Sequence, residues 1–119
     1  HTKYLKKYSK YFILPKQLPQ SKTGWLAYPI TIKENAPFSR TQMQIFLEKK
    51  NIQTRVVFTG NILRQPGFKN IKARKDKKGY PEADKVMRNG ILIACHNGLT
   101  KNMINHIHYS IDAFMKKYT

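Results

Sequence analysis

The spacing of apolar residues predicts a helix near each end of the chain. In residues 3–12 (KYLKKYSKYF), large apolar and aromatic side chains recur at intervals of three and four, the period of one helical face, while lysines fill the other side. Thr100 is a suitable N-cap for a second helix. The apolar stripe of that helix comprises Met103, Ile104, Ile107, Ile111, Phe114 and Met115.

Three segments between these helices have the composition of strands. Residues 25–33 (WLAYPITIK) alternate in apolar and β-branched character, and residues 91–96 (ILIACH) are the most apolar strand candidate. Residues 53–58 end in the apolar run Val56 to Phe58, which is typical of a short buried strand. Pro29 has no backbone N–H to donate, so we expect an edge position or a bulge there.

Two further helices are predicted between the strands. Ser39 followed three residues later by Gln42 forms a possible capping box for a helix that reaches about Lys50. Residues 82–88 suggest one or two helical turns that end before Gly90. The order of these elements predicts a two-layer α+β domain with about three strands and with helices on one face of the sheet.

The length of 119 residues suits a single domain with one modest core. Two prolines and the polar run QSKTG make residues 15–24 a linker-like connection, so residues 25–119 are the predicted α+β domain. No apolar run approaches the roughly 18 residues that a membrane helix needs. Cys95 is the only cysteine, which excludes an internal disulfide and favours a reducing, cytoplasmic setting.

The chain is strongly basic. Lys and Arg number 23 against six Asp and Glu, and the net charge of +17 should attract polyanions such as nucleic acid. Base readers and phosphate clamps favour Arg, whereas 18 of the 23 are Lys, so a general drift toward Lys, Asn and Ile also explains the charge. Residues 69–81 hold six basic residues and form either a mobile loop or a polyanion contact. A freestanding basic nucleic-acid-binding domain is therefore the alternative hypothesis for function.

No motif of a self-contained enzyme or metal site is present. The chain lacks a P-loop, a GxGxxG fingerprint, a CxxC pair and an HExxH box. His106 and His108 are two residues apart on a predicted helix, so they point in different directions and are poorly placed to share a metal. His96 follows a predicted buried strand at a turn, where it either faces a cleft or bonds locally. We predict no catalytic residue and no metal ligand in this chain.

Polar groups that follow the second predicted strand are the best binding candidates. Gly60 permits close backbone approach, and Asn61 offers both a donor and an acceptor. Arg64 and Gln65 add a permanent charge and an amide, and Arg55 precedes them. Loops just past strand ends commonly hold ligand contacts on a rigid base. Ordinary turn chemistry explains the same residues, so a binding loop and a structural loop both remain open on spacing alone.

Several segments together resemble a known family. ITIKENAPFSR, IQTRVVFTGNILRQPGF and PEADKVMRNGILIACHNGLT occur in this order, followed by the C-terminal amphipathic helix. From about residue 11 to residue 118 the chain resembles the C-terminal small domain of the DegT/StrS-type sugar aminotransferases, which are pyridoxal phosphate (PLP) enzymes of the aspartate-aminotransferase fold. It is most similar to the branch that includes the nucleotide-sugar 3-dehydrases. The TR-x-x-F-x-GN-x-x-RQP pattern of that branch is matched by Thr54, Arg55, Phe58, Gly60, Asn61, Arg64, Gln65 and Pro66.

The resemblance implies a function that needs more polypeptide than this chain provides. In such enzymes a large domain holds PLP, its aspartate partner and the Schiff-base lysine (a histidine in the dehydrases), and none of these motifs occurs here. Residues 1–14 are then the end of an interdomain helix. The chain is expected to be a C-terminal fragment, inactive alone, of a nucleotide-sugar aminotransferase or dehydratase of deoxysugar or lipopolysaccharide biosynthesis. The implied parent enzyme is a homodimer.

The same resemblance places the small domain over the active-site cleft. The residues that it implies as substrate contacts are Arg55, Asn61, Arg64, Gln65 and, by a weaker match, His96. The lysine-rich stretch at residues 72–78 departs from the family pattern. That departure bears on the expected ligand preference and on the shape of that side of the domain.

Overall fold

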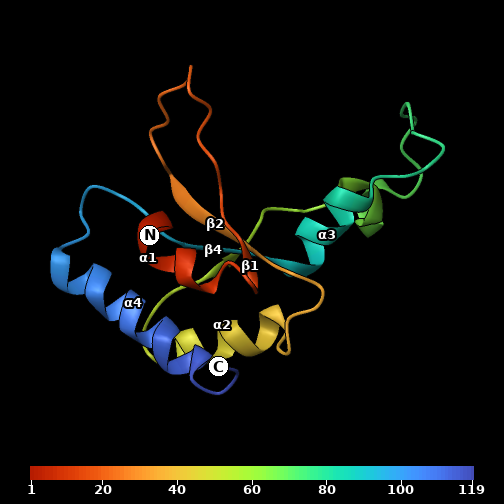
Figure 1. The fold of residues 1–119 in the computed structure, drawn as a ribbon. Coiled ribbons are helices and arrows are strands. Elements are labelled where there is room, and N and C mark those ends of the chain that lie inside the picture. The colour runs from red at the N-terminus through yellow and green to blue at the C-terminus, as the bar shows by residue number, and fades with distance from the viewer.

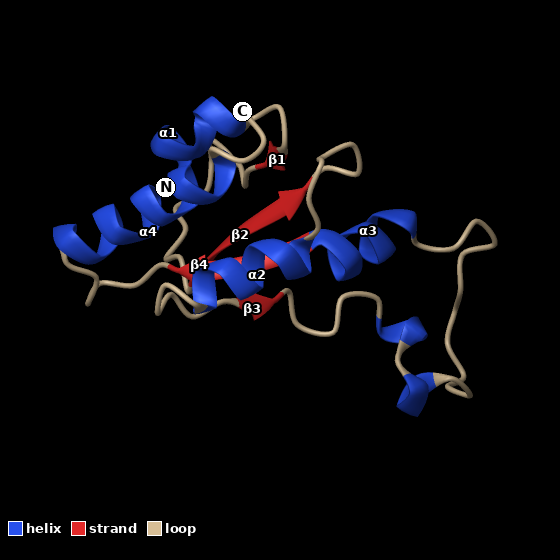
Figure 2. Cartoon of the chain, turned by 90° about the horizontal axis from the view of Figure 1, so that it is seen from below, coloured by secondary structure: helices blue, strands red, loops and turns tan.

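Helices cover one face of a four-stranded antiparallel sheet in the computed structural model, which describes residues 1–119 (Figure 1). The strands are β1 (Phe12–Ile13), β2 (Ala27–Ile32), β3 (Arg55–Val56) and β4 (Gly90–Ala94), in the spatial order β1-β2-β4-β3. The helices are α1 (Thr2–Leu5), α2 (Arg40–Glu48), α3 (Pro81–Asn89) and α4 (Lys101–Met115). Figure 2 shows α2 and α4 on the same side of the sheet, whereas α3 leads directly into β4. The predicted two-layer α+β class is confirmed.

The fourth strand comes from a segment that was predicted to be helical. Helix α1 ends at Leu5, a 3-10 turn follows at Lys6–Tyr8, and Phe12 then pairs with Ile32 of β2. Pairing with β2 supplies backbone hydrogen-bond partners and buries Phe12, which is only 2% exposed. The prediction of one continuous helix over residues 3–12 was therefore wrong at its C-terminal end.

The core lies between the two central strands and the helices. Burial alternates along β2, and Tyr28 and Ile30 pair across the sheet with Ile93 and Ile91 of β4, all four being buried. The helical partners of these side chains are Met43 and Leu47 of α2 and Ile107, Ile111, Phe114 and Met115 of α4. The core thus depends on the period of two along the strands and on the apolar stripe of α4.

The predicted N-terminal signals of α2 and α4 are confirmed. The Ser39 hydroxyl accepts the N–H of Gln42 (3.2 Å), and the Gln42 side chain accepts the N–H of Ser39 (2.7 Å), which completes the capping box. Thr100 accepts the N–H of Met103 (3.3 Å) through its hydroxyl. Met103 itself is 52% exposed rather than buried as predicted, because the first turn of α4 borders an open groove.

Pro29 lies in a central strand yet at a locally open edge. Strand β2 is flanked by β1 and β4, but β1 pairs only with Thr31 and Ile32. Beside Pro29, the side of β2 that faces away from β4 therefore has no strand neighbour. The missing N–H of Pro29 suits such a position, so the expected edge character is local to this residue.

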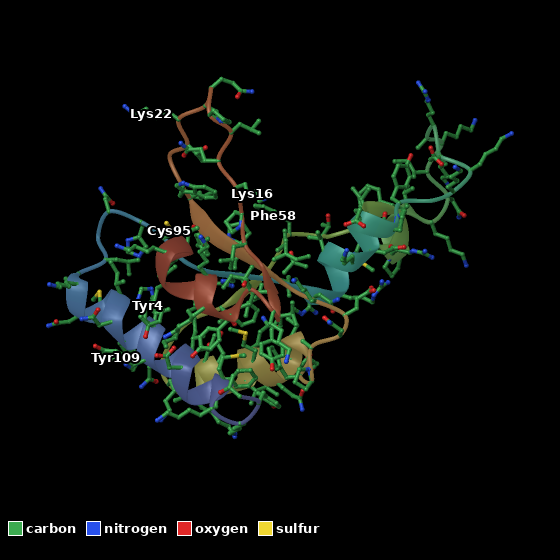
Figure 3. All side chains as sticks on the ribbon, in the orientation of Figure 1. Tyr4, Lys16, Lys22, Phe58, Cys95 and Tyr109 are labelled. Carbon is green, nitrogen blue, oxygen red and sulfur yellow. The ribbon has the colours of Figure 1, made fainter.

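The second predicted strand is shorter and more exposed than expected. Strand β3 contains two residues, and the exposed fractions of Val56 and Phe58 are 45% and 79%. The side chain of Phe58 is labelled in Figure 3. Strand β3 is an edge strand that pairs only with β4, and Phe58, with φ of 45°, turns the chain away from the sheet. The prediction of a buried strand over residues 53–58 was therefore wrong.

A long connection joins β3 to α3. It contains two 3-10 turns, Ile62–Arg64 and Pro66–Phe68, and then an exposed irregular stretch that continues to Tyr80. The short helix predicted over residues 82–88 is confirmed as α3. None of the helices combines the length and the apolarity that crossing a membrane requires.

Candidate functional site

A groove opens at the end of the sheet where β4 is followed by α4. Its volume is about 650 Å³, and ten of its 16 lining residues are hydrophobic. The lining comes from the start of β2, the segment before β3, the end of β4 and the first turns of α4. Its polar lining residues are Asn51, Gln53, Arg55, His96, Asn102 and His106. A mostly apolar cavity with a few convergent polar groups is the usual form of a small-molecule site.

Two of the five predicted site residues, Arg55 and His96, come together in this groove. Arg55 is exposed on β3 and takes part in none of the ion pairs of the chain. Its guanidinium is near Glu48, whose pKa is lowered mainly by hydrogen bonds from Thr54 and to a smaller extent by the charge of Arg55. The permanent charge of Arg55 is therefore available to a ligand.

His96 satisfies both interpretations that its sequence position allowed. The N–H of Gly98 donates to Nδ1 of His96 (3.1 Å), so the turn is bonded locally, and the ring also lines the groove. Because Nδ1 accepts this hydrogen bond, the neutral ring carries its hydrogen on Nε2. His96 therefore offers Nε2–H as a donor.

A second histidine of the groove was not among the predicted site residues. Nε2 of His106 lies 2.8 Å from the carbonyl oxygen of Lys50, so the neutral ring donates through Nε2 and leaves Nδ1 as an acceptor. Asn102, one helical turn earlier on α4, lines the same groove. The spacing of four residues between them was the only sequence signal that could have placed both in one site. The groove thus combines a cation, a ring donor, a ring acceptor and amides, which suits a polar ligand that carries oxygen atoms.

The other predicted site residues are bonded within the chain near α3. Asn61 is buried, its Nδ2 donates to Oδ1 of Asp84 (2.7 Å), and its Oδ1 accepts the N–H of Leu63 (3.1 Å). Arg64 donates through Nε to Oδ1 of Asp84 (3.1 Å) and through Nη2 to Oδ2 (2.9 Å). This bidentate geometry is the strong form of an arginine–carboxylate pair. We refer to Asn61, Arg64 and Asp84 as the clamp.

Two further motif residues hold the same loop against α3. Nε2 of Gln65 donates to the carbonyl of Thr59 (2.8 Å). Gly60 has φ of 61°, and a Cβ placed there would overlap Cβ of Met87. Both the backbone conformation and the contact with Met87 therefore require glycine at this position. The loop between β3 and α3 is fixed by its own motif residues.

Sequence reasoning also missed Asp84, the acceptor of the clamp. Its side chain is 12% exposed, and hydrogen bonds from Arg64 first and Asn61 second lower its pKa from 3.8 to about 2. The available signal was weak, because Asp84 looked like an ordinary acid in the first turn of a predicted helix. Its partners lie 20 and 23 positions earlier in the sequence, so spacing gave no indication of the contact.

A separate aromatic cluster fixes the N-terminal segment on α4. The hydroxyls of Tyr4 and Tyr8 donate to Asp112 (2.6 and 2.7 Å), and Lys7 forms an ion pair with the same carboxylate (2.8 Å). The ring of His108 stacks on Tyr4 with centroids 3.9 Å apart, and burial lowers the pKa of His108. His108 itself is buried on α4, with an exposed fraction of 8%.

The groove residues do not fit the cofactor that the sequence resemblance implies. Proteins hold PLP through a lysine at its aldehyde carbon and an Asp or Arg at its pyridine nitrogen. The lining of the groove contains no lysine and no carboxylate. A PLP site would therefore have to be supplied by other polypeptide, and no chemical step is assigned to the cofactor at this groove.

Comparison with known proteins places this chain within an aminotransferase family. The sequence matches the DegT/DnrJ/EryC1/StrS aminotransferase family over residues 2–112. The chain is 32% identical, over 106 residues, to the lipopolysaccharide biosynthesis protein RfbH of Salmonella typhimurium. It is 34% identical, over 105 residues, to a dTDP-4-dehydro-2,6-dideoxy-D-glucose 3-dehydratase of Saccharopolyspora spinosa. These matches cover 89% and 88% of this chain but only 23% and 22% of the two relatives, so the chain spans about a quarter of their length.

A solved structure shares the fold. The E. coli GDP-4-keto-6-deoxy-D-mannose-3-dehydratase, determined with bound hydrated PLP, superposes with a TM-score of 0.77 at 19% identity. The superposition covers 90% of this chain and 28% of that enzyme. The arrangement of four strands and covering helices is therefore that of one part of a larger enzyme.

Proposed function

Because the chain belongs to the DegT/DnrJ/EryC1/StrS aminotransferase family, we propose that it is the C-terminal small domain of a PLP-dependent nucleotide-sugar aminotransferase or dehydratase. In this proposal residues 1–14 end the connection to a large domain and also add β1 to the sheet, residues 15–24 are a linker, and residues 25–119 are the domain that covers the cleft. When bound by the large domain, PLP supplies the electron sink for chemistry on the sugar. The small domain binds and orients the substrate.

The groove that Arg55 shares with His96 is the observation that carries this proposal. Both residues were selected as substrate contacts from the sequence, and 41 positions separate them, yet they line one cavity of about 650 Å³. In the proposed role, the Arg55 guanidinium binds an anionic group of the nucleotide sugar. The Nε2–H of His96 donates to a sugar or phosphate oxygen, and the apolar lining excludes water.

Asn61, Arg64 and Gln65 have a different place in the proposal. Their hydrogen bonds to Asp84 and Thr59 hold the loop in shape, which makes Asn61 a positioning residue. Arg64 keeps 64% of its side chain exposed although one edge binds Asp84, so its outer edge is free to meet an anionic group of the substrate. Substrate contact by Arg64 and Gln65 remains a prediction.

The proposed parent enzyme is a cytoplasmic homodimer involved in deoxysugar or lipopolysaccharide biosynthesis. The similarity to RfbH and to a nucleotide-sugar 3-dehydratase supports the assignment to this kind of biosynthesis. The 119-residue chain alone is expected to bind no PLP and to turn over no substrate, since the groove lacks the groups that hold PLP. We also propose non-specific polyanion binding, which the net charge of +17 supports.

The test uses the complete protein that contains this chain. Arg55→Gln and His96→Gln are compared with Lys49→Gln, which replaces an exposed residue outside the groove. We expect each groove variant to weaken binding of the nucleotide sugar by about tenfold or more, the loss of one charge-assisted hydrogen bond, as measured by calorimetry. Absorbance of the bound cofactor should remain unchanged in all three. Wild-type affinity in both groove variants would contradict the proposed role.

A further inference from the structure

A lysine-rich segment, residues 69–78, projects from the end of the molecule near α3; we call it the basic arm (Figure 1). Six of its ten residues are basic and one is acidic, which gives a net charge of +5. Every residue of the arm is exposed, and none takes part in an ion pair. The arm therefore concentrates unpaired positive charge well above the average of 23 basic residues in 119.

The local structure of the arm leaves its lysines uncovered. Asp76, the only acid, accepts the N–H of Lys78 on its side chain (2.7 Å), and its own N–H donates to the hydroxyl of Tyr80 (3.0 Å). The N–H of Gly79, at φ of 72°, donates to the Asp76 carbonyl (3.1 Å). The carboxylate thus forms a turn and pairs with no lysine of the arm. Figure 3 shows the side chains of this segment spread outward.

The clamp joins the segments that precede and follow the basic arm. The arm begins after the 3-10 turn Pro66–Phe68 and ends shortly before α3, and the Arg64–Asp84 pair joins these two sides (2.9 Å). Helix α3 precedes β4, whereas the groove lies beyond the other end of that strand. The arm and the groove therefore lie at opposite ends of β4, and a partner on the arm leaves the groove open.

The chemistry of the arm fits a lipid surface better than a nucleic acid. Five of its six basic residues are Lys, whereas base reading and bidentate phosphate contacts favour Arg. Apolar side chains flank the charges, with Phe68, Ile71 and Tyr80 exposed to 39%, 44% and 40%. Clustered lysines with neighbouring apolar groups suit the negative headgroups and the acyl boundary of an anionic bilayer. We propose that the basic arm is a peripheral contact site for an anionic membrane surface.

The test measures binding of the chain to vesicles by co-sedimentation. One set contains phosphatidylcholine alone and the other contains added phosphatidylglycerol. The arm variant carries four substitutions, Lys72→Gln, Lys75→Gln, Lys77→Gln and Lys78→Gln. The matched control carries the same loss of charge on exposed lysines elsewhere, Lys3→Gln, Lys49→Gln, Lys101→Gln and Lys116→Gln. Circular dichroism verifies that both variants fold.

We expect the wild-type chain to bind only the anionic vesicles, and the arm variant to bind them about 600-fold more weakly, at about fivefold for each of the four charges removed. The control variant should lose at most about tenfold, because its lysines are dispersed. Equal losses in the two variants would show that only the overall charge matters and would overturn the proposal. The arm variant could also bind vesicles as the wild type does but no longer bind duplex DNA. That result would overturn the proposal and would assign the arm to nucleic acid.

A second variant tests the apolar part of the site. Ile71→Ser keeps every charge and removes one exposed apolar side chain. We expect a loss of binding of about tenfold or less that persists at high salt, whereas the electrostatic part is screened. If high salt abolished all binding in the wild type, apolar insertion would be excluded and the proposal would fail in that part.

Discussion

The groove and the clamp use residues of one sequence motif in opposite ways. Arg55 lies in the groove with its charge unpaired, whereas Arg64, nine positions later, is bonded to Asp84 through two nitrogens. Asn61 is buried with both polar atoms of its amide satisfied. The first arginine of the motif is therefore available for binding, while the asparagine and second arginine first of all hold a loop.

This comparison shows that polar residues close in sequence can have different roles, and that their contacts reveal which role each one has. A buried polar group must be hydrogen-bonded, so Asn61 required a partner, and α3 supplies it as Asp84. An exposed group on an edge strand has no such requirement, so Arg55 remains free. Stability and binding should therefore respond to different substitutions along the same motif.

The largest effect is expected when the clamp is opened. Asp84→Ala leaves the buried amide of Asn61 and the Nε of Arg64 without their acceptor. We expect the melting temperature to fall by about 5 °C or more, measured by circular dichroism at neutral pH.

The control for this substitution lies on the same helix. The side chain of Glu82 is 82% exposed and forms only a 3.4 Å pair with Lys85, so Glu82→Ala should lower the melting temperature by about 2 °C or less. Comparable losses in Asp84→Ala and Glu82→Ala would mean that the clamp is an ordinary surface contact, and the contrast with the groove would disappear.

Low pH should weaken the clamp in the wild-type protein. The pKa of Asp84 is lowered from 3.8 to about 2, so its stabilising effect is complete above the ordinary value and is lost as pH falls through about 2. Asp84→Asn removes this titration. The difference in melting temperature between wild type and Asp84→Asn should therefore be largest near neutral pH and should shrink between pH 3.8 and about 2.

Other carboxylates titrate in the same range but are common to both proteins. Hydrogen bonds from Thr54 lower the pKa of Glu48, and bonds from Lys7 and the two tyrosines lower that of Asp112 although burial opposes the shift. Their contributions cancel in the difference between wild type and variant. A difference that stays constant from neutral pH down to about 2 would show that Asp84 is not held as a carboxylate by the clamp.

Local signals in the sequence were sufficient to predict most helices. The capping box at Ser39, the N-cap at Thr100 and the stripe that follows it depend on residues within one or two turns, so they could be read directly. The two-layer α+β class followed from the order of these elements. Helix α3 was recognised for the same reason, since its signals are also local.

Long-range contacts account for what the sequence did not show. Phe12 belongs to a strand only because Ile32, 20 positions away, pairs with it. Val56 and Phe58 look like a buried strand, yet β3 lies at the edge and the chain leaves the sheet there. At the site, Arg55 and His96 were selected from turn chemistry and family resemblance, while Asp84 was missed because its partners are remote in sequence.

The smallest effect on folding is expected at the groove. Arg55→Gln and His96→Gln remove exposed groups with no long-range side-chain partner, so the free energy of unfolding should change by about 0.5 kcal/mol or less in urea titrations. Arg64→Gln is the informative comparison, because the same replacement at position 64 breaks the pair with Asp84. If Arg55→Gln and Arg64→Gln shifted the urea midpoint equally, both arginines would be structural. The groove would then not be the binding site of the domain, because a side chain that stabilises the fold is not free to bind a ligand.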